Sequence, residues 1–272
     1  MEPFFINSPS GTVFALYHPP EDQPGVRGNI LFIPPFAEEL NRSRHMINRQ
    51  ARAFAKTGYA VLILDLFGTG DSEGTFGEAT VPRWQQDILA ALSWLEKKSG
   101  KPVILWAMRS GALLAADLVR QYPGLTDQLI LWSPVGDGRK FITRYLRIKL
   151  AANLSNNTDG TRNSLKELWA ELENGHSLEI AGYSLSPDLA HGLSALSLGK
   201  TKLPRELSVK WIEQSPMAPP ILSPAAQKVI DSWENDGVSM SVTVVNDIAF
   251  WTLQEPEWAV NYIDQTSRML QN

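Results

Sequence analysis

The sequence has no cysteine among its 272 residues. Disulfide bonds, thiol catalysis and cysteine-based metal sites are therefore excluded, and the absence is typical of proteins from a reducing compartment. The first residues lack a basic segment followed by a long apolar core, and no apolar run is long enough to span a bilayer. We therefore expect a cytoplasmic protein without a transmembrane segment.

Positive charge is also in short supply. The chain has 25 Lys and Arg against 29 Asp and Glu, a net charge of −4 and a pI near 5.6, and it contains no long basic run. This composition gives no reason to expect a nucleic-acid partner. Glycine-rich phosphate loops, dinucleotide-binding fingerprints and metal-ligand spacings are absent as well, so we expect neither a cofactor nor a metal.

Histidine is the third scarce residue. The four histidines are His18, His45, His176 and His191, and none follows His191. A serine nucleophile needs a positioned base, which is usually histidine. This distribution therefore restricts where a hydrolytic site could be built.

Hydrophobic patterning indicates one large α/β domain. Short, wholly apolar runs predict buried strands and amphipathic runs predict helices between them, an alternation that requires right-handed crossovers and a mostly parallel sheet. The predicted strands are a hairpin at 4–6 and 12–17, then 29–33, 59–65, 103–108, 128–134, 207–212 and 241–245. Two of the predicted helices end near 56–58 and near 122, and two others cover 82–98 and 256–270.

The stretch 135–204 breaks this rhythm and predicts a cap inserted after the sixth strand, which would shape a pocket and control access to it. Its parts are helical patterns at 141–150 and 164–172, a short strand pair at 178–186 and a loop-like 153–160. We expect 1–134 and 205–272 to form the core.

The stretch 103–115 consists of an apolar run, a sharp polar break and a helical pattern. The break, Ala107 to Gly111, corresponds to the strained strand-to-helix turn Gly-x-Ser-x-Gly of the α/β-hydrolase fold. In that frame Arg109 occupies the nucleophile's position and Ser110 comes one residue late. Arginine is a permanently charged donor without a nucleophilic lone pair, so the usual nucleophile is missing.

A second motif follows the predicted strand 59–65. Its spacing is Asp65-x-x-Gly68-x-Gly70-x-Ser72, a turn common in α/β hydrolases. The glycines permit backbone angles that other residues avoid, and the polar side chains fix the loop. The motif supports an α/β-hydrolase fold, with a mostly parallel central sheet flanked by helices, and says little about chemistry.

The loop after the strand 29–33 is charged where a substrate would enter. In α/β hydrolases it supplies a backbone amide to the oxyanion hole. Its candidate ligand-binding residues are Pro35, Phe36, Glu38, Glu39 and Arg44. Either the charged residues cap the helix start and form surface ion pairs, or a glutamate faces Arg109, because an unpaired buried guanidinium would cost several kcal/mol.

The positions that normally supply the acid and the base are altered. Glu213 follows the strand 207–212 and is the nearest stand-in for the triad acid, although a plain loop carboxylate is at least as good an interpretation. The loop after the last strand normally carries the catalytic histidine but here contains Asp247 and Phe250, which we expect to line the ligand site.

Four segments resemble one branch of the α/β-hydrolase superfamily: Pro34 to Arg44, Asp65 to Ser72, Trp106 to Ala112, and Ala249 to Trp251. The chain looks like the second type of hydrolase associated with the exosortase A system, and the resemblance covers nearly the whole chain. Members are encoded near exosortase and exopolysaccharide genes in Gram-negative bacteria and are called hydrolases by superfamily membership. The resemblance implies that Arg109 is a trait of this branch.

Three hypotheses follow. Ser110 could act as a displaced nucleophile on an ester, thioester or acyl group; a shift of one residue on a tight turn and the missing base weigh against it. Arg109 could instead grip a carboxylate or phosphate of an acyl- or sugar-type ligand without hydrolysis. Third, Glu38 or Glu39 could lock Arg109 in an interaction protein. We favour the last two hypotheses. An open pocket at Arg109 would support ligand binding, and a guanidinium fully paired with Glu38 or Glu39 would support the structural role.

Overall fold

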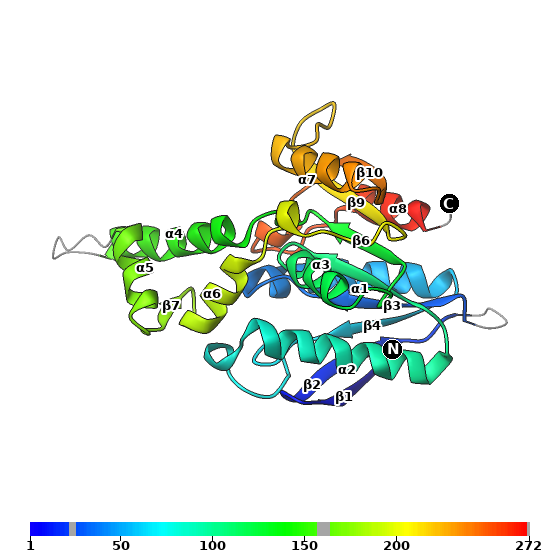
Figure 1. Cartoon of the computed structure of the whole chain (residues 1–272), viewed down its shortest axis with the longest axis horizontal. Coiled ribbons are helices and arrows are strands. Elements are labelled where there is room, and N and C mark those ends of the chain that lie inside the picture. Colours follow the sequence, from blue (N-terminus) through cyan, green and yellow to red (C-terminus); the bar gives the residue numbers. More distant parts are fainter. Residues whose placement is uncertain (22–25, 157–163, 271–272) are drawn as a thin grey trace.

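The computed structural model describes residues 1–21, 26–156 and 164–270. Its centre is an eight-stranded sheet in the order β1-β2-β4-β3-β5-β6-β9-β10 (Figure 1). The strands are β1 (Glu2–Ser8), β2 (Gly11–His18), β3 (Gly28–Ile33), β4 (Tyr59–Leu64), β5 (Val103–Met108), β6 (Gln128–Trp132), β9 (Ser208–Ser215) and β10 (Ser239–Asn246). The pairs β1–β2 and β2–β4 are antiparallel and the others parallel, which confirms the predicted mostly parallel sheet.

Helices and short 3₁₀ turns connect the strands. The helices are α1 (Glu38–Lys56), α2 (Val81–Ser99), α3 (Gly111–Gln121), α4 (Gly138–Asn156), α5 (Leu165–Glu173), α6 (Pro187–Ala195), α7 (Pro224–Asn235) and α8 (Val260–Met269). The 3₁₀ turns are η1 (Phe76–Glu78), η2 (Leu198–Lys200) and η3 (Phe250–Thr252). Within the described residues no helix is both long and apolar enough to cross a membrane.

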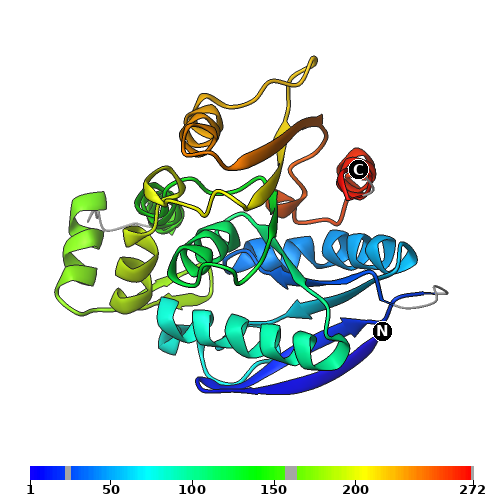
Figure 2. The same cartoon turned by 45° about the vertical axis from the view of Figure 1, so that its right-hand side comes forward.

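The sheet separates two apolar cores (Figure 2). On one face α1 and α8 pack against the alternate strand residues Phe32, Trp106 and Trp132. On the other face α2, α3 and α7 cover the remaining strand side chains. Trp106 and Trp132 meet edge to face, with ring centroids 4.8 Å apart, and both are fully buried. The all-apolar strands are therefore explained by burial on both faces.

Between β6 and β9 lies a helical segment, 138–200, that contains α4, α5, α6 and the small hairpin of β7 (Leu178–Ile180) and β8 (Tyr183–Leu185). Figure 1 shows it projecting beyond one end of the sheet. The predicted hairpin and the two predicted helices are present here. However, α4 continues to Asn156, so the first part of the loop expected at 153–160 is helical and the rest lies outside the described residues.

Three element predictions need correction. The closing helix begins at Val260 rather than at 256. The Glu257 carbonyl oxygen is bound by His45 Nε2 and not by a helical N–H. Asp247 Oδ2 accepts the Tyr262 N–H at 3.2 Å, which satisfies a donor in the first turn of the helix. Strand β9 runs on to Ser215. Helices α6 and α7 were not predicted, although each begins with a Ser-Pro pair whose serine accepts a backbone N–H, a recognised N-terminal signal.

The turn 65–72 has the structural role that its motif predicts. Gly70 has φ +54°, and a Cβ there would lie 1.8 Å from Asp65 Oδ2, so only glycine fits. Ser72 Oγ donates to the Asp65 carbonyl at 2.7 Å, and Arg44 donates to Asp65 Oδ2 at 3.0 Å. Arg44 is thereby used to fix this turn.

Candidate functional site

The turn between β5 and α3 places one strained residue at its apex. Arg109 has φ +52°, a left-handed conformation that is unfavourable for a residue with a Cβ. Tertiary hydrogen bonds fix it: its N–H donates to the Trp132 carbonyl at 2.9 Å, and its carbonyl accepts from Val135 at 3.0 Å. At Gly111 a Cβ would lie 2.6 Å from the carbonyl oxygens of Ile33 and Pro34. This strand-to-helix turn therefore has the strained backbone geometry of an elbow, with arginine at its apex.

The Arg109 guanidinium is bound on two sides. Nε and Nη2 both donate to Glu39 Oε1, each at 3.2 Å, and Nη1 donates to the Ser133 carbonyl at 2.9 Å. Its carbon lies 5.0 Å from the centroid of the Trp251 ring. The side chain is 15% exposed and that of Glu39 22%. Three of the five N–H donors are used among the described residues, and the charge is paired with one carboxylate.

Glu39 reaches Arg109 from the first turn of α1, where the helix dipole favours a carboxylate. Its second oxygen, Oε2, is buried and has no hydrogen-bond partner among the described residues. The neighbouring Glu38 instead accepts a hydrogen bond from the Tyr183 hydroxyl at 3.0 Å and lies 3.7 Å from Arg42. Burial, and then the bond to Glu38, raise the pKa of Tyr183 to about 12.

Ser133 is a second strained residue, with φ +38°, at the end of β6. Its Oγ accepts from the Gln214 N–H at 3.0 Å and lies 2.8 Å from the Tyr262 hydroxyl, which donates to the Ile212 carbonyl at 2.9 Å. Burial raises the pKa of Tyr262. This network connects Ser133, whose carbonyl accepts a hydrogen bond from Arg109, to β9 and α8. Sequence reasoning missed Ser133, which it placed inside the predicted strand 128–134, whereas β6 ends at Trp132 and Ser133 follows it.

Ser110 does not face the cavities that Arg109 borders. It is 4% exposed, has helical backbone angles and borders only a space of about 10 Å³ with Pro35 and Phe36. No hydrogen bond joins it to a histidine in the part of the chain that the structure describes. The alcohol therefore has neither the elbow's strained geometry nor a neighbouring base.

The four histidines are elsewhere. His18 is buried on β2, where burial lowers its pKa, and His45 Nε2 lies 2.8 Å from the Glu257 carbonyl oxygen. His176 and His191 are exposed in the 138–200 segment. None of the four lines either cavity beside Arg109.

Of the remaining candidate residues, Glu213 lines a cavity, whereas Asp247 and Phe250 have structural roles. Glu213 lies inside β9, not after it; its Oε2 accepts from the Trp211 indole at 2.9 Å, and the residue lines one cavity. Asp247 accepts backbone N–H groups from Ile248 and Tyr262, which fixes the approach to α8. Phe250 is buried in the core beside α8. Asp247 and Phe250 therefore support the site without lining either cavity.

Two cavities meet at Arg109. One, of about 350 Å³, is lined in part by aromatic residues such as Phe36, Tyr145 and Trp251. Glu38, Glu39 and Arg42 form a charged part of the same wall. The other, of about 500 Å³, carries Lys140 and Lys228. Arg109, Phe141 and Arg144 border both.

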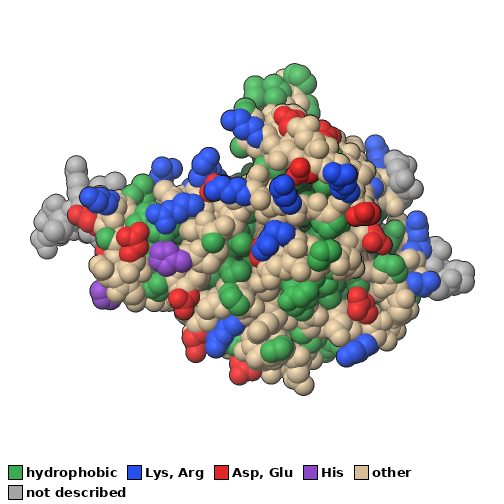
Figure 3. Space-filling view, in the orientation of Figure 1, with side chains coloured by type: hydrophobic (Ala, Val, Ile, Leu, Met, Phe, Trp, Pro, Cys, Tyr) green, Lys and Arg blue, Asp and Glu red, His purple; other side chains and the backbone are tan. Residues whose placement is uncertain are grey.

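The second cavity, which we call the basic cavity, has an excess of positive charge. Its cations are Arg109, Lys140, Arg144 and Lys228, and its acids are Asp137 and Glu213. Among the described residues Lys140, Arg144 and Lys228 form no ion pair. Basic side chains gather around the hollow between α4 and α7 in the space-filling view (Figure 3). An anionic group would find unused partners here.

No cluster of three or more His, Cys, Asp or Glu side chains suited to a metal occurs in residues 1–21, 26–156 and 164–270.

Solved structures with the same fold include a carboxyl esterase and other α/β hydrolases. Est1E from Butyrivibrio proteoclasticus, solved with ferulic acid, has a TM-score of 0.65 at 12% identity, and the alignment covers 98% of this chain and 96% of that one. A thermostable carboxyl esterase from Bacillus coagulans, in complex with glycerol, has a TM-score of 0.61 at 14% identity over 90% and 89%. Mouse α/β hydrolase domain-containing protein 10 has 0.60 at 15% over 100% and 97%. These identities establish the fold alone.

No curated protein sequence matches the chain. The model of the Hydrolase_4 family, described as serine aminopeptidase, S33, matches residues 24–169, which is more than half of the chain and includes the elbow. The chain therefore belongs to the Hydrolase_4 family of α/β hydrolases.

Proposed function

We propose that this chain is a non-hydrolytic binding protein that takes an anionic, acyl-type ligand in the cleft beside Arg109. One observation carries the proposal: the elbow residue is a cation that borders two cavities, and three further cations without ion pairs line one of them. Because the Arg109 charge is paired with Glu39, we assign most of the anion's attraction to Lys140, Arg144 and Lys228. Arg109 contributes its two remaining N–H donors.

The two cavities suit the two ends of an amphiphile. An acyl or aromatic group would lie against Phe36, Tyr145 and Trp251, since these side chains offer apolar surface. The carboxylate or phosphate would lie in the basic cavity, where charge-assisted hydrogen bonds are available. Arg109, Phe141 and Arg144 border both spaces and would contact the junction of the ligand.

The 135–204 stretch has the role of a cap in this proposal. Phe141, Arg144 and Tyr145 of α4 form walls of the cavities, while Arg109 comes from the core. A ligand would thus be bound between the two parts of the chain, a common location for binding sites.

A second candidate is a structural role for Arg109 in an interaction protein. The observation that favours it is the bond set itself: Glu39, Ser133 and Trp251 enclose the guanidinium and would hold the elbow without any ligand. This role is compatible with binding nearby. Hydrolysis by Ser110 has less support, because that serine is buried without a base.

The cellular setting rests on the resemblance of the four sequence motifs to exosortase-associated proteins. We propose a cytoplasmic role in exopolysaccharide production or protein sorting, with an acyl carrier, a lipid-linked sugar or a polysaccharide precursor as ligand. An anionic group of such a ligand would lie in the basic cavity.

Titration calorimetry with decyl phosphate and decanol tests the proposed binding. We expect decyl phosphate to bind and decanol to bind at least about tenfold more weakly, since the alcohol lacks charge. Lys140→Gln/Lys228→Gln should weaken decyl phosphate binding by about tenfold and leave decanol unchanged.

The control removes two exposed charges that line neither of these cavities, as Lys97→Gln/Lys101→Gln at the end of α2. It should bind decyl phosphate like the parent chain. Equal affinity for phosphate and alcohol, or an unchanged affinity in Lys140→Gln/Lys228→Gln, would contradict the assignment.

A further inference from the structure

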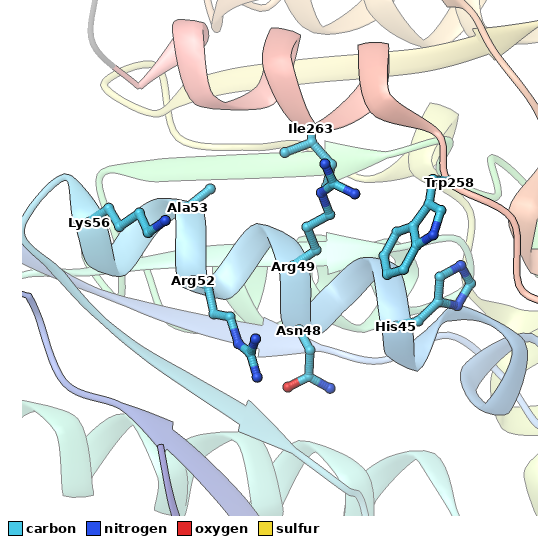
Figure 4. Close-up of a pocket in the computed structure, with 8 residues that line it drawn as sticks. All are labelled: His45, Asn48, Arg49, Arg52, Ala53, Lys56, Trp258 and Ile263. Carbon is cyan, nitrogen blue, oxygen red and sulfur yellow. The ribbon is translucent and has the colours of Figure 1, made fainter.

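A second basic hollow lies along α1, beside Trp258 and the start of α8. It has a volume of about 530 Å³ (Figure 4). Its lining includes His45, Arg49, Arg52 and Lys56 and no acidic residue. We call it the α1 groove. It does not share a lining residue with either cavity at Arg109.

The cations of the α1 groove are unpaired, unlike the others on the same helix. Arg42 pairs with Glu38 and Arg44 with Asp65. Among the described residues Arg49, Arg52 and Lys56 form no ion pair. Like charges one or two helical turns apart repel one another, so their concentration in a chain of net charge −4 calls for a cause.

The helix dipole explains only part of this concentration. Lys56 lies in the last turn of α1, where a cation is favoured. Arg49 comes seven residues earlier, about 10 Å along the axis, and His45 earlier still. The dipole effect fades within one turn, so it does not account for Arg49 or His45.

An exposed aromatic ring lies at the end of the α1 groove that is nearest the start of α1 and holds two side chains there. Trp258 is 53% exposed, although large apolar side chains are usually covered. The Arg49 guanidinium lies 4.9 Å from its ring centroid and the His45 ring 5.2 Å away. Since a carbonyl oxygen can only accept, His45 donates from Nε2 to Glu257. These contacts restrict Arg49 and His45 before any ligand arrives, which lowers the entropy cost of binding.

The floor between the two ends is small and apolar. Ala53 lies between Arg49 and Lys56 along the helix, and Ile263 of α8 faces it (Figure 4). The short alanine side chain leaves room there, so an anion could reach Arg49 and Lys56 together. One phosphate cannot span about 10 Å of helix, whereas linked phosphates place several negative charges along that length.

We propose that the α1 groove is a binding site for a ligand with two or more linked or neighbouring phosphates, in addition to the cleft at Arg109. Arg49, Arg52 and Lys56 bind the phosphate oxygens, and Trp258 with its stacked Arg49 covers the adjoining part of the ligand. The phosphates come from a soluble compound or from a phosphorylated lipid headgroup, two sources with the same chemistry.

Calorimetry with inorganic triphosphate on the full chain tests the site at low and physiological salt. We expect binding that weakens as salt rises, because both partners are charged. Arg52→Gln/Lys56→Gln should weaken it by about tenfold, and Trp258→Ala by about threefold, since Arg49 loses its stacking partner. The side chains of Arg52 and Lys56 form no hydrogen bond or ion pair with the described residues, so we expect the fold to be retained, which a melting curve checks.

Lys97→Gln/Lys101→Gln is the matched control: both lysines are exposed at the end of α2, neither lines a cavity of either site, and the charge change is the same. Sedimentation with phosphatidylcholine vesicles, plain or containing phosphatidylinositol bisphosphate, separates the sources. Binding to these vesicles but not to triphosphate, lost in Arg52→Gln/Lys56→Gln, assigns the site to lipid headgroups. Absence of binding to both probes, or equal weakening in the two double variants, overturns the proposal and leaves the cleft at Arg109 unaffected.

Discussion

Arg109→Met lowers the free energy of unfolding by about 3 kcal/mol, measured by urea denaturation. Methionine has a similar length but no charge, so the Glu39 carboxylate loses its cation and the Ser133 carbonyl loses a donor. Removing one partner of a buried ion pair typically costs about 3–5 kcal/mol. The lower end applies here, because side-chain exposures of 15% and 22% let water reach the pair.

The matched control is Arg120→Met, at an ion pair whose arginine is 49% exposed. The Asp117 side chain is only 11% exposed but keeps the hydrogen bonds from Gln85 and Gln121, so the loss of Arg120 should cost about 1 kcal/mol. The double variant Arg109→Met/Glu39→Met should be more stable than Arg109→Met alone, because the unpaired carboxylate is gone. An Arg109→Met protein within about 0.5 kcal/mol of the parent chain would contradict a structural role for the pair.

Gly138→Ala disrupts the packing of α4 against α6 and destabilises the chain by about 3 kcal/mol. A Cβ at residue 138 would lie 1.8 Å from the Leu193 carbonyl oxygen and 2.8 Å from its carbon. Both are backbone atoms, so one helix must move. Because Phe141, Arg144 and Tyr145 are on α4, decyl phosphate binding should weaken in parallel.

Gly136→Ala controls for the loss of glycine itself. A Cβ at residue 136 meets only Val229 Cγ2, at 3.7 Å, an ordinary contact. Its urea midpoint should therefore equal that of the parent chain. If Gly138→Ala also unfolds at the parent midpoint, α4 and α6 pack less tightly than the structure describes.

The centre of the sheet could be predicted from the sequence, because β3 to β6 are almost wholly apolar and strand signals are strong when both faces are buried. The elbow could be placed by the strand before it and Gly111 after it. Helices α6 and α7 were missed, although Ser-Pro pairs marked their starts. The strand–helix rhythm received more weight than these local signals.

The sequence limits the ion-pair partner of Arg109 to Glu38 or Glu39 but does not decide between them. Glu38 and Glu39 are adjacent on a helix, so their side chains point about 100° apart. Which one faces the elbow depends on the rotation of α1, which its packing against the sheet decides. Trp251 and Ser133 join the site only through tertiary structure, from loops after different strands.

The α1 groove illustrates how a composition total can conceal a local feature. The net charge is −4 and no basic run occurs. However, Arg49, Arg52 and Lys56 recur at intervals of three and four residues, which places them along one side of a helix. Trp258 is more than 200 residues away in the sequence and reaches the groove only because α8 packs beside α1.

The central claim is that this fold binds a ligand at Arg109 without serine hydrolysis. Labelling of the purified protein with a fluorophosphonate probe, mapped by mass spectrometry, tests it most directly. An active serine hydrolase treated identically, and the Ser110→Ala variant, are the controls. We predict no adduct at Ser110 or elsewhere, because Ser110 is buried without a base and Arg109 cannot act as a nucleophile. An adduct at Ser110 that disappears in Ser110→Ala would contradict this account and identify a hydrolase with a displaced nucleophile.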